Sequence, residues 1–148
     1  MGLLESLGIS ASALNAQRLR MDVIAHNVAN VNSTRGADGG PFRRQVVSFK
    51  ALTDGAAGLA APLPGGADGL PGRGVGVDRI DTDQTPGRRV YDPSHPDADA
   101  DGFVETSNVD LVVEMTDMVS AVRAYEASVT ALNAAKTMAQ SALDLAGR

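Results

Sequence analysis

The residues whose spacing most resembles a ligand-binding motif form an alternating run of aspartates, Asp97–Gly102. Its positions match the first six of an EF-hand calcium loop, in which carboxylates alternate and a turn glycine follows. The twelfth position of that loop requires a bidentate glutamate, but this chain has Asn108 there, and Pro93 and Pro96 are incompatible with the helix that should precede it. We therefore expect a solvated turn rather than a specific calcium site.

Other groups that could do chemistry are sparse. The two histidines, His26 and His95, are too few for a zinc site, and we expect both to be structural. Gly72–Gly76 resembles a phosphate-binding loop but lacks the lysine and the following helix of that motif, which predicts flexible backbone. The sequence has no cysteine and no recognisable pairing of a nucleophile with a base. We predict no enzyme activity, no cofactor and no metal site.

Charge and hydropathy argue against two classes of partner. Lys and Arg number 13 against 18 Asp and Glu, and the net charge of -5 opposes binding to nucleic acid. No stretch approaches the roughly 20 apolar residues that a membrane-spanning helix needs. The first basic residue is Arg18, so the N-terminus lacks the layout of a cleaved secretory signal. We expect no nucleic-acid partner, no membrane span and no cleaved signal peptide.

Two long periodic segments, one near each end of the chain, must form the framework that positions any functional residues. In the first, from about Leu3 to Val31, apolar residues recur every seven positions with others three residues further on, which predicts a helix with one apolar seam. The turn-forming run Asn30–Gly36 then ends the helix, whose length would be about 40 Å. The residues of this seam are Leu7, Leu14, Met21 and Val28, with Ile24 and Val31.

The second periodic segment begins after Ser107–Asp110, whose end residues have the spacing of a capping box, and it ends at Gly147. Two interleaved heptad positions along it are almost entirely apolar, and Lys136 is the interruption. This helix would be about 55 Å long, which exceeds the diameter of a compact domain of this size. One position holds Met115, Val122, Val129 and Leu143, and the other holds Leu111, Met118, Tyr125, Leu132, Ala139 and Ala146.

The segment between the helices lacks a helical period. Its Gly- and Pro-rich stretch 53–76 predicts a flexible loop. We expect a mainly α fold, in which two long terminal helices form an antiparallel coiled-coil-like pair with a small irregular β-hairpin and loop insert between them. The runs rich in β-forming residues, which predict a small antiparallel sheet or paired hairpins, are Arg44–Phe49, Val75–Ile80, Arg89–Tyr91 and Phe103–Val104.

The predicted organisation has three parts: an N-terminal helix with its asparagine-rich turn in 1–36, the insert in 37–106, and the C-terminal helix in 107–148. Heptads do not reveal whether each seam meets the other helix or a neighbouring subunit. Length favours neighbours, because little globular material is available to cover the seams. A helical adaptor that binds one partner without polymerising is the alternative, and an enzyme is the third choice.

Residues in both helices resemble a known family. Asparagines spaced at the end of the first helix resemble the N-terminal signature of flagellar rod, hook and hook-associated proteins. That signature usually continues Thr-Pro-Gly-Tyr, whereas this chain leads to a pair of arginines, which is typical of the proximal-rod members. Residues of the second helix match the same group. The matching residues are Asn27, Asn30, Asn32, Arg43, Arg44, Arg123, Tyr125 and Glu126.

The resemblance implies a structural subunit of the proximal rod of the bacterial flagellar basal body, part of the hollow drive shaft that transmits torque and lets export substrates pass. The implied partners are other copies of the chain, the axial proteins FlgB, FliE, FlgF and FlgG, and the flagellar type III export apparatus, which would deliver it without a cleaved signal peptide. Monomers would travel partly unfolded, and their helices would order on docking.

The resemblance also implies roles for particular residues. Asn27 and Asn30 would fix the turn below the helix by side-chain to backbone hydrogen bonds, and a plain helix cap is the alternative. The apolar seams would form the assembly interface. Its expected residues are Leu7, Leu14, Met21, Ile24, Val28, Leu111, Met115, Met118, Val122, Tyr125, Val129, Leu132 and Leu143.

Overall fold

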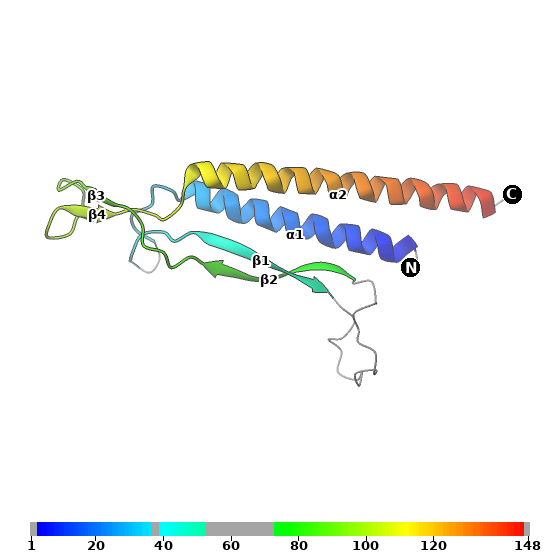
Figure 1. Cartoon of the computed structure of the whole chain (residues 1–148), viewed down its shortest axis with the longest axis horizontal. Helices are drawn as coiled ribbons and strands as arrows, with labels where there is room; N and C mark the ends of the chain where they lie inside the picture. Colours follow the sequence, from blue (N-terminus) through cyan, green and yellow to red (C-terminus); the bar gives the residue numbers. More distant parts are fainter. Residues whose placement is uncertain (1–2, 37–38, 53–72, 147–148) are drawn as a thin grey trace, which may run out of the picture.

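The computed structural model describes residues 3–36, 39–52 and 73–146 and shows an elongated molecule (Figure 1). The two helices lie side by side and run in opposite directions, so both termini lie at the same end, and the β3–β4 hairpin projects from the other end. The elements in chain order are α1 (Leu3–Ala29), β1 (Gln45–Leu52), β2 (Gly74–Thr82), β3 (Arg89–Tyr91), β4 (Phe103–Glu105) and α2 (Leu111–Ala146).

Helix α1 ends at the asparagine-rich turn. The Asn30 backbone N–H donates to the carbonyl oxygens of His26 and Asn27, at 3.2 and 3.1 Å, and its side-chain Nδ2 donates to the His26 carbonyl oxygen at 2.9 Å. The Ser33 hydroxyl donates to Asn30 Oδ1 at 3.0 Å. The Asn30 side chain therefore satisfies a carbonyl at the helix end, which corresponds to the helix-cap alternative, and its bond to the turn runs to the Ser33 side chain and not to the backbone.

Helix α2 begins with a cap formed by one residue. Asp110 Oδ1 accepts hydrogen bonds from the N–H groups of Val112 and Val113, at 2.9 and 3.3 Å. The predicted capping box is wrong, because the Ser107 hydroxyl accepts a hydrogen bond from the Val109 N–H at 3.2 Å, which lies before the first residue of the helix. The carboxylate at the helix N-terminus also complements the helix dipole.

The insert consists of two antiparallel hairpins. In the first, β1 pairs with β2 from Gln45 opposite Thr82, with a bulge between Ser48 and Phe49. In the second, β3 pairs with β4, and Arg89 lies opposite Glu105. The prediction of paired antiparallel hairpins is confirmed. Because strands form much of the described part of the insert, the fold is less purely helical than the predicted mainly α class.

The predicted flexible stretch 53–76 meets the structure only at its end. Residues 53–72 lie outside the described residues. Gly74–Gly76 are not a loop, because they pair with β1 as the beginning of β2. The Gly-rich composition suggested loop there, whereas the backbone of these glycines supplies regular ladder hydrogen bonds.

Gly74 is a glycine because α1 lies against it. Its φ of +121° is a conformation that side-chain-bearing residues rarely adopt, and a Cβ there would lie 2.1 Å from Ser12 Oγ. Ser12 Oγ instead accepts a hydrogen bond from the Val75 N–H at 3.1 Å and donates to the Ile9 carbonyl oxygen at 2.7 Å. This close approach ties α1 to the beginning of β2.

Helix α1 is the middle layer of the molecule. Helix α2 covers one side of it, and the β1–β2 hairpin covers the other (Figure 1). The buried apolar side chains of the two helices are small or of medium size, which lets the helices approach closely. These residues are Ala16, Val23 and Ile24 in α1 and Ala121 and Ala135 in α2.

Candidate assembly interface

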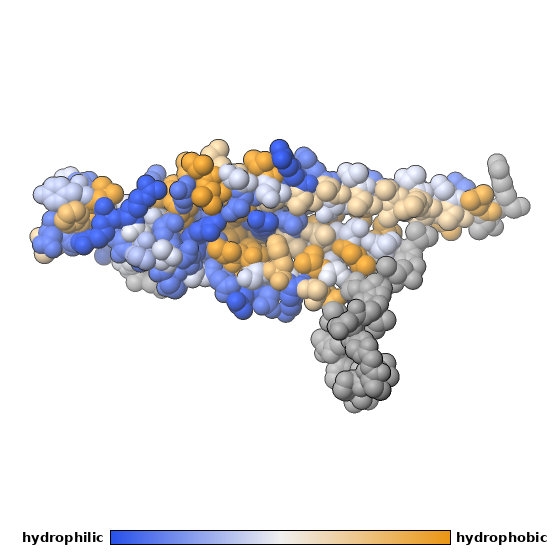
Figure 2. Space-filling view, in the orientation of Figure 1, coloured by the Kyte–Doolittle hydropathy of each residue, from blue (hydrophilic) through white to orange (hydrophobic). Residues whose placement is uncertain are grey.

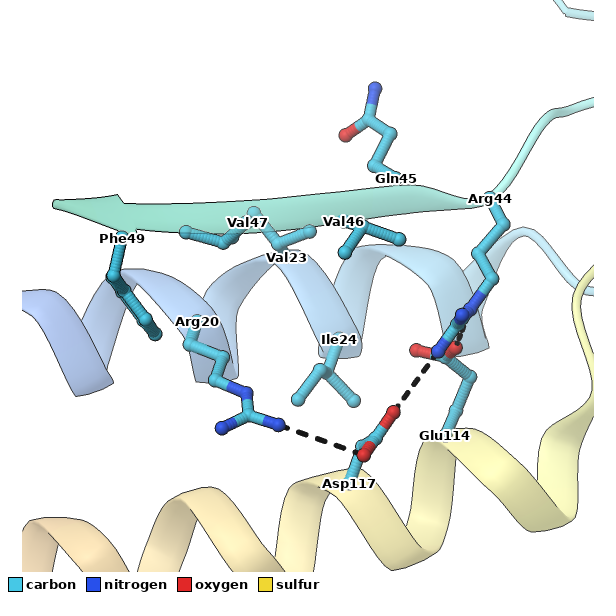
Figure 3. Close-up of a pocket in the computed structure, with 10 residues that line it drawn as sticks. All are labelled: Arg20, Val23, Ile24, Arg44, Gln45, Val46, Val47, Phe49, Glu114 and Asp117. Carbon is cyan, nitrogen blue, oxygen red and sulfur yellow. Dashed lines mark hydrogen bonds and ion pairs between the residues drawn. The ribbon is translucent and has the colours of Figure 1, made fainter. Parts of the chain in front are cut away.

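A cluster of polar side chains joins three segments at one end of the helix pair, and Figure 3 shows three of its members, Arg44, Glu114 and Asp117. We call Asn27, Arg44, Glu114 and Asp117 the polar junction. Asn27 comes from the last turns of α1, Arg44 immediately precedes β1, and Glu114 and Asp117 lie in the first two turns of α2. Asn27 and Glu114 are the largest fully buried side chains among the described residues, at 1% and 0% exposure.

Asn27 links all three segments through its amide. Its Nδ2 donates to the Gln45 carbonyl oxygen at 2.8 Å and to Glu114 Oε2 at 3.0 Å, and its Oδ1 accepts from the Gln45 N–H at 2.9 Å. The predicted side-chain to backbone bond of Asn27 therefore exists, but it reaches strand β1 and not the turn below the helix. Three hydrogen bonds satisfy this buried amide almost completely.

Arg44 neutralises the buried carboxylate. Its Nε donates to Glu114 Oε1 at 2.5 Å, and its Nη2 donates to Asp117 Oδ2 at 3.0 Å. Arg20 of α1 lies 3.6 Å from the other Asp117 oxygen. Partial burial opposes the charged form of Arg44, but the hydrogen bond to Glu114 and the charges of Glu114, Asp117 and Asp83 outweigh it, so the pKa of Arg44 is raised above its ordinary value.

The backbone around the arginine pair is held from the other side by Asn108. Asn108 Oδ1 accepts from the Arg44 N–H at 2.7 Å, and its Nδ2 donates to the carbonyl oxygens of Asp83 and Thr85, at 3.1 and 3.0 Å. Arg43 points toward the β3–β4 hairpin, where it binds Glu105 at 2.9 Å. The two adjacent arginines therefore anchor different parts of the fold.

The remaining motif residues lie at or near the surface. Asn32 is exposed at the turn after α1. On α2, Arg123 and Glu126 are exposed, and Tyr125 is half-buried. These three do not join the polar junction.

The predicted seam of α2 divides into two groups. Met118, Tyr125, Val129 and Leu132 are partly buried. Leu111, Met115, Val122 and Leu143 are exposed, by 44%, 59%, 38% and 71%. Beside the partly buried group, a third heptad position also faces α1 and is the most buried. It holds Glu114, Ala121, Ser128 and Ala135, which are small or polar and carry no hydrophobic signal.

The predicted seam of α1 is covered more evenly. Ile24 is buried, and the other members are half-buried because α2 and the β1–β2 hairpin both lie against this helix. The half-buried members are Leu7, Leu14, Met21 and Val28.

A second apolar surface lies on the side of α2 away from α1. We call Val112, Met115 and Val119 the outer face; with Arg123 and intervening threonine and serine side chains they border a shallow surface depression. At 100° per residue these positions point away from Glu114 and Ala121. The three apolar side chains are exposed by 73%, 59% and 52%. Of them only Met115 belonged to the predicted seam.

Sequence reasoning missed Glu114 and the Val112 and Val119 positions. Glu114 had one detectable signal, because an acidic residue occupied a heptad position otherwise held by Ala and Ser. Its partners Asn27 and Arg44 lie 87 and 70 residues away in the chain, and no local pattern relates them.

The aspartate run forms the turn between β3 and β4. The pKa of Asp99 is lowered chiefly by the hydrogen bond from the Phe103 N–H, with further contributions from Arg89 and from the Asp101 N–H. Asp97 accepts from the Thr34 hydroxyl at 2.9 Å. Within the described ranges, no three His, Asp or Glu side chains are placed to hold a metal ion.

His26 and His95 have ordinary structural surroundings. The His26 ring meets Phe42 edge to face at 5.2 Å between centroids, and His95 Nδ1 accepts from the Asp97 N–H at 3.1 Å. Neither helix contains an apolar stretch long enough to cross a membrane in the part that the structure describes.

Comparison with known proteins gives consistent matches in both halves of the chain. Residues 7–37 match the family described as flagella basal body rod protein, and residues 100–145 match the family described as flagellar basal body rod FlgEFG protein C-terminal. These two segments contain most of α1 and α2, and therefore every helical residue of the polar junction.

Curated relatives are similar over nearly the whole length. The flagellar basal-body rod protein FlgC of Borreliella burgdorferi is 46% identical over 147 residues, which cover 97% of each chain. The FlgC of Bacillus subtilis is 44% identical over 144 residues, 95% of each chain. The FlgC of Salmonella typhimurium is 41% identical over 145 residues, 98% of each chain.

Proposed function

Because this chain belongs to the FlgC family of flagellar basal-body rod proteins, we propose that it polymerises into the rod through its two terminal helices. It is a structural subunit of the flagellar basal body. The polar junction supports this role, because its side chains join α1, β1 and α2 with hydrogen bonds and ion pairs and enclose no reactive centre. These contacts hold the two helices and the first strand together.

The observation that carries the assembly proposal is the outer face of α2. Large apolar side chains rarely gather on the surface of a monomer unless another molecule covers them. Figure 2 shows hydrophobic atoms along the exposed edge of α2 near its beginning, beside strongly hydrophilic atoms. By helical periodicity the outer face is turned away from α1, and its apolar side chains are exposed.

A second uncovered surface lies at the end of α2. This helix has 36 residues, whereas α1 has 27. Because α1 ends and α2 begins near the polar junction, the far end of α2 extends beyond the beginning of α1 (Figure 1). Leu143 lies on the same side of α2 as Leu132 by helical periodicity, but it is 71% exposed because it lies beyond the region paired with α1. We infer that the helices form a coiled-coil-like pair within the chain, and that this overhang continues the same packing against a neighbouring subunit.

The finer assignment rests on the sequence resemblance. We propose a place in the proximal rod, with FlgB, FliE, FlgF, FlgG and other copies as neighbours, and delivery by the type III export apparatus without a cleaved signal peptide. In this proposal residues 1–36 and 107–148 form the core of a hollow shaft that carries torque, and residues 37–106 lie outside it.

Incorporation into basal bodies tests the proposal. Val119→Asp places a charge on the outer face, and because Val119 is 52% exposed the isolated chain should fold normally. We expect the variant to keep its helical circular dichroism and to be lost from purified basal bodies, since the charge would be desolvated in the contact. Ala131→Asp, at another exposed position of α2, is the matched control. Normal incorporation of the Val119 variant would contradict the assigned surface.

A further inference from the structure

The side chains through which α2 meets α1 leave its axial position weakly specified. Beyond Glu114 the inward heptad position holds Ala121, Ser128 and Ala135. Small side chains allow close approach, but a helix shifted by one heptad presents another small side chain at the same place. The half-buried larger residues beside this position recur at the same interval of seven, so they also repeat after such a shift.

The rest of the fold fixes α1 but not α2. Helix α1 is tied to the β1–β2 hairpin at two places, through Asn27 and the Gln45 backbone and through Ser12 and the Val75 N–H. Asn108 tethers the chain shortly before α2, and a tether of this length restricts a slip to about two turns, which is one heptad, without excluding it. The choice must come from a contact that exists in one register alone.

Glu114 makes such a contact. Both of its oxygens are bonded, one to Arg44 and one to Asn27, and none of its surface is exposed. A slip of one heptad would separate this carboxylate from its cation and bring Ala121 opposite Arg44, and either change costs free energy. We propose that the Arg44–Glu114 ion pair sets the axial register of α2 against α1 and β1.

The proposal distinguishes register from stability. Buried ion pairs contribute little net stability relative to apolar pairs of similar size, and fixing a register is their best-attested use. One consequence rests on the proposed function: the register determines the height along the rod at which the outer face of α2 is presented to neighbouring subunits.

The experiment removes the ion pair without leaving a charge behind. The chain contains no cysteine, so Ala25→Cys and Ala127→Cys, both at exposed positions, accept one spin label on each helix. The distance distribution between the labels is measured by double electron–electron resonance in the full chain, with and without the double substitution Arg44→Met and Glu114→Leu.

We expect one distance in the parent and a second population in the double variant, displaced along the helix axis by about 10 Å, the length of one heptad. Helical content and the urea midpoint should be unchanged or raised, because an apolar pair replaces the charged one. Glu126→Leu, at an exposed position of the same helix, is the matched control and should keep the single parental distance.

Two results would overturn the proposal. The double variant could keep the single parental distance, which means that the seam alone determines register. It could instead lose its helices despite the apolar replacements, which means that the pair acts through stability. Because the measurement uses the free chain, either result leaves the proposed assembly role intact, and loss of that role leaves the register result intact.

Discussion

At the scale of single residues, Glu114 and Arg44 are an unequal pair. The Glu114 side chain has no exposure, whereas 25% of the Arg44 side chain is exposed and Asp117 can still pair with it. Removing the arginine therefore leaves a buried carboxylate without its cation, whereas removing the glutamate leaves an arginine that still has a carboxylate partner. The two single substitutions should have different costs.

We predict that Arg44→Ala lowers the free energy of unfolding by about 3–5 kcal/mol, the cost typical of an uncompensated buried charge. Glu114→Ala should cost distinctly less, since Arg44 keeps Asp117 and partial access to water. Urea unfolding followed by circular dichroism measures both values. Equal losses would show that the carboxylate is better solvated than its position indicates.

A second residue-scale prediction concerns two glycines of opposite character. Gly74→Ala should destabilise the chain, because the residue has a φ of +121° and its new Cβ would lie 2.1 Å from Ser12 Oγ. Gly8→Ala is the control: nothing lies within 4 Å of its Cβ position inside α1, so it should stabilise the helix by about 0.5–1 kcal/mol. Thermal midpoints of the two variants should move in opposite directions.

At the scale of elements, the sequence was most informative about the helices. Both helix bounds agree with the periodic segments to within a few residues, and all four β-forming runs became strands, because these features depend on local pattern. The pattern identified the periodic apolar positions and left open which of them face α1 and which face a neighbouring subunit. The large side chains of Met115 and Val122 are exposed, whereas the positions most deeply buried against α1 are held by small residues, whose burial depends on tertiary packing.

The candidate site was predictable only in its parts. Asn27 and Arg44 were named as motif residues from the family resemblance, but their shared partner Glu114 was assigned no role. The contact joins residues 70 and 87 positions apart, and neither helical period nor local spacing encodes a separation of that kind. Val112 and Val119 were missed for the converse reason: they lie outside the heptad, and their exposure becomes evident only once the side facing α1 is known.

The seam residues carry a prediction for this scale. Leu132→Asp should abolish incorporation into the rod, as should Leu14→Asp, because each introduces an unpaired charge where a half-buried leucine packs. Asn133→Asp, at the exposed neighbouring position, should assemble normally. Basal bodies isolated from cells that express each variant would show which chains are present. Motile cells carrying Leu132→Asp would refute the seam assignment.

At the scale of the whole molecule, order should be graded along the helix pair. Buried polar contacts gather at the end where α1, β1 and α2 meet, whereas Met138, Leu143 and Leu145 near the other end are exposed by 63%, 71% and 77%. A segment with few buried contacts opens at low free energy. The proposal that helices order on docking therefore applies most strongly to the end remote from the polar junction.

Hydrogen exchange of the isolated chain tests this gradient. We predict slow exchange in α2 near Glu114 and Ala121 and fast exchange from about Met138 onward, with α1 slowest near Asn27. Uniform protection along both helices in the monomer would contradict ordering on assembly.

The most direct test of the central claim is a cryo-electron microscopy reconstruction of an intact basal body at side-chain resolution. The account predicts that Val112, Met115 and Val119 of each subunit of this chain are covered by helices of neighbouring rod subunits, while Glu114 keeps its contact with Arg44 inside the chain. A rod in which the outer face of α2 is open to solvent, and subunits join through the β hairpins alone, would contradict it.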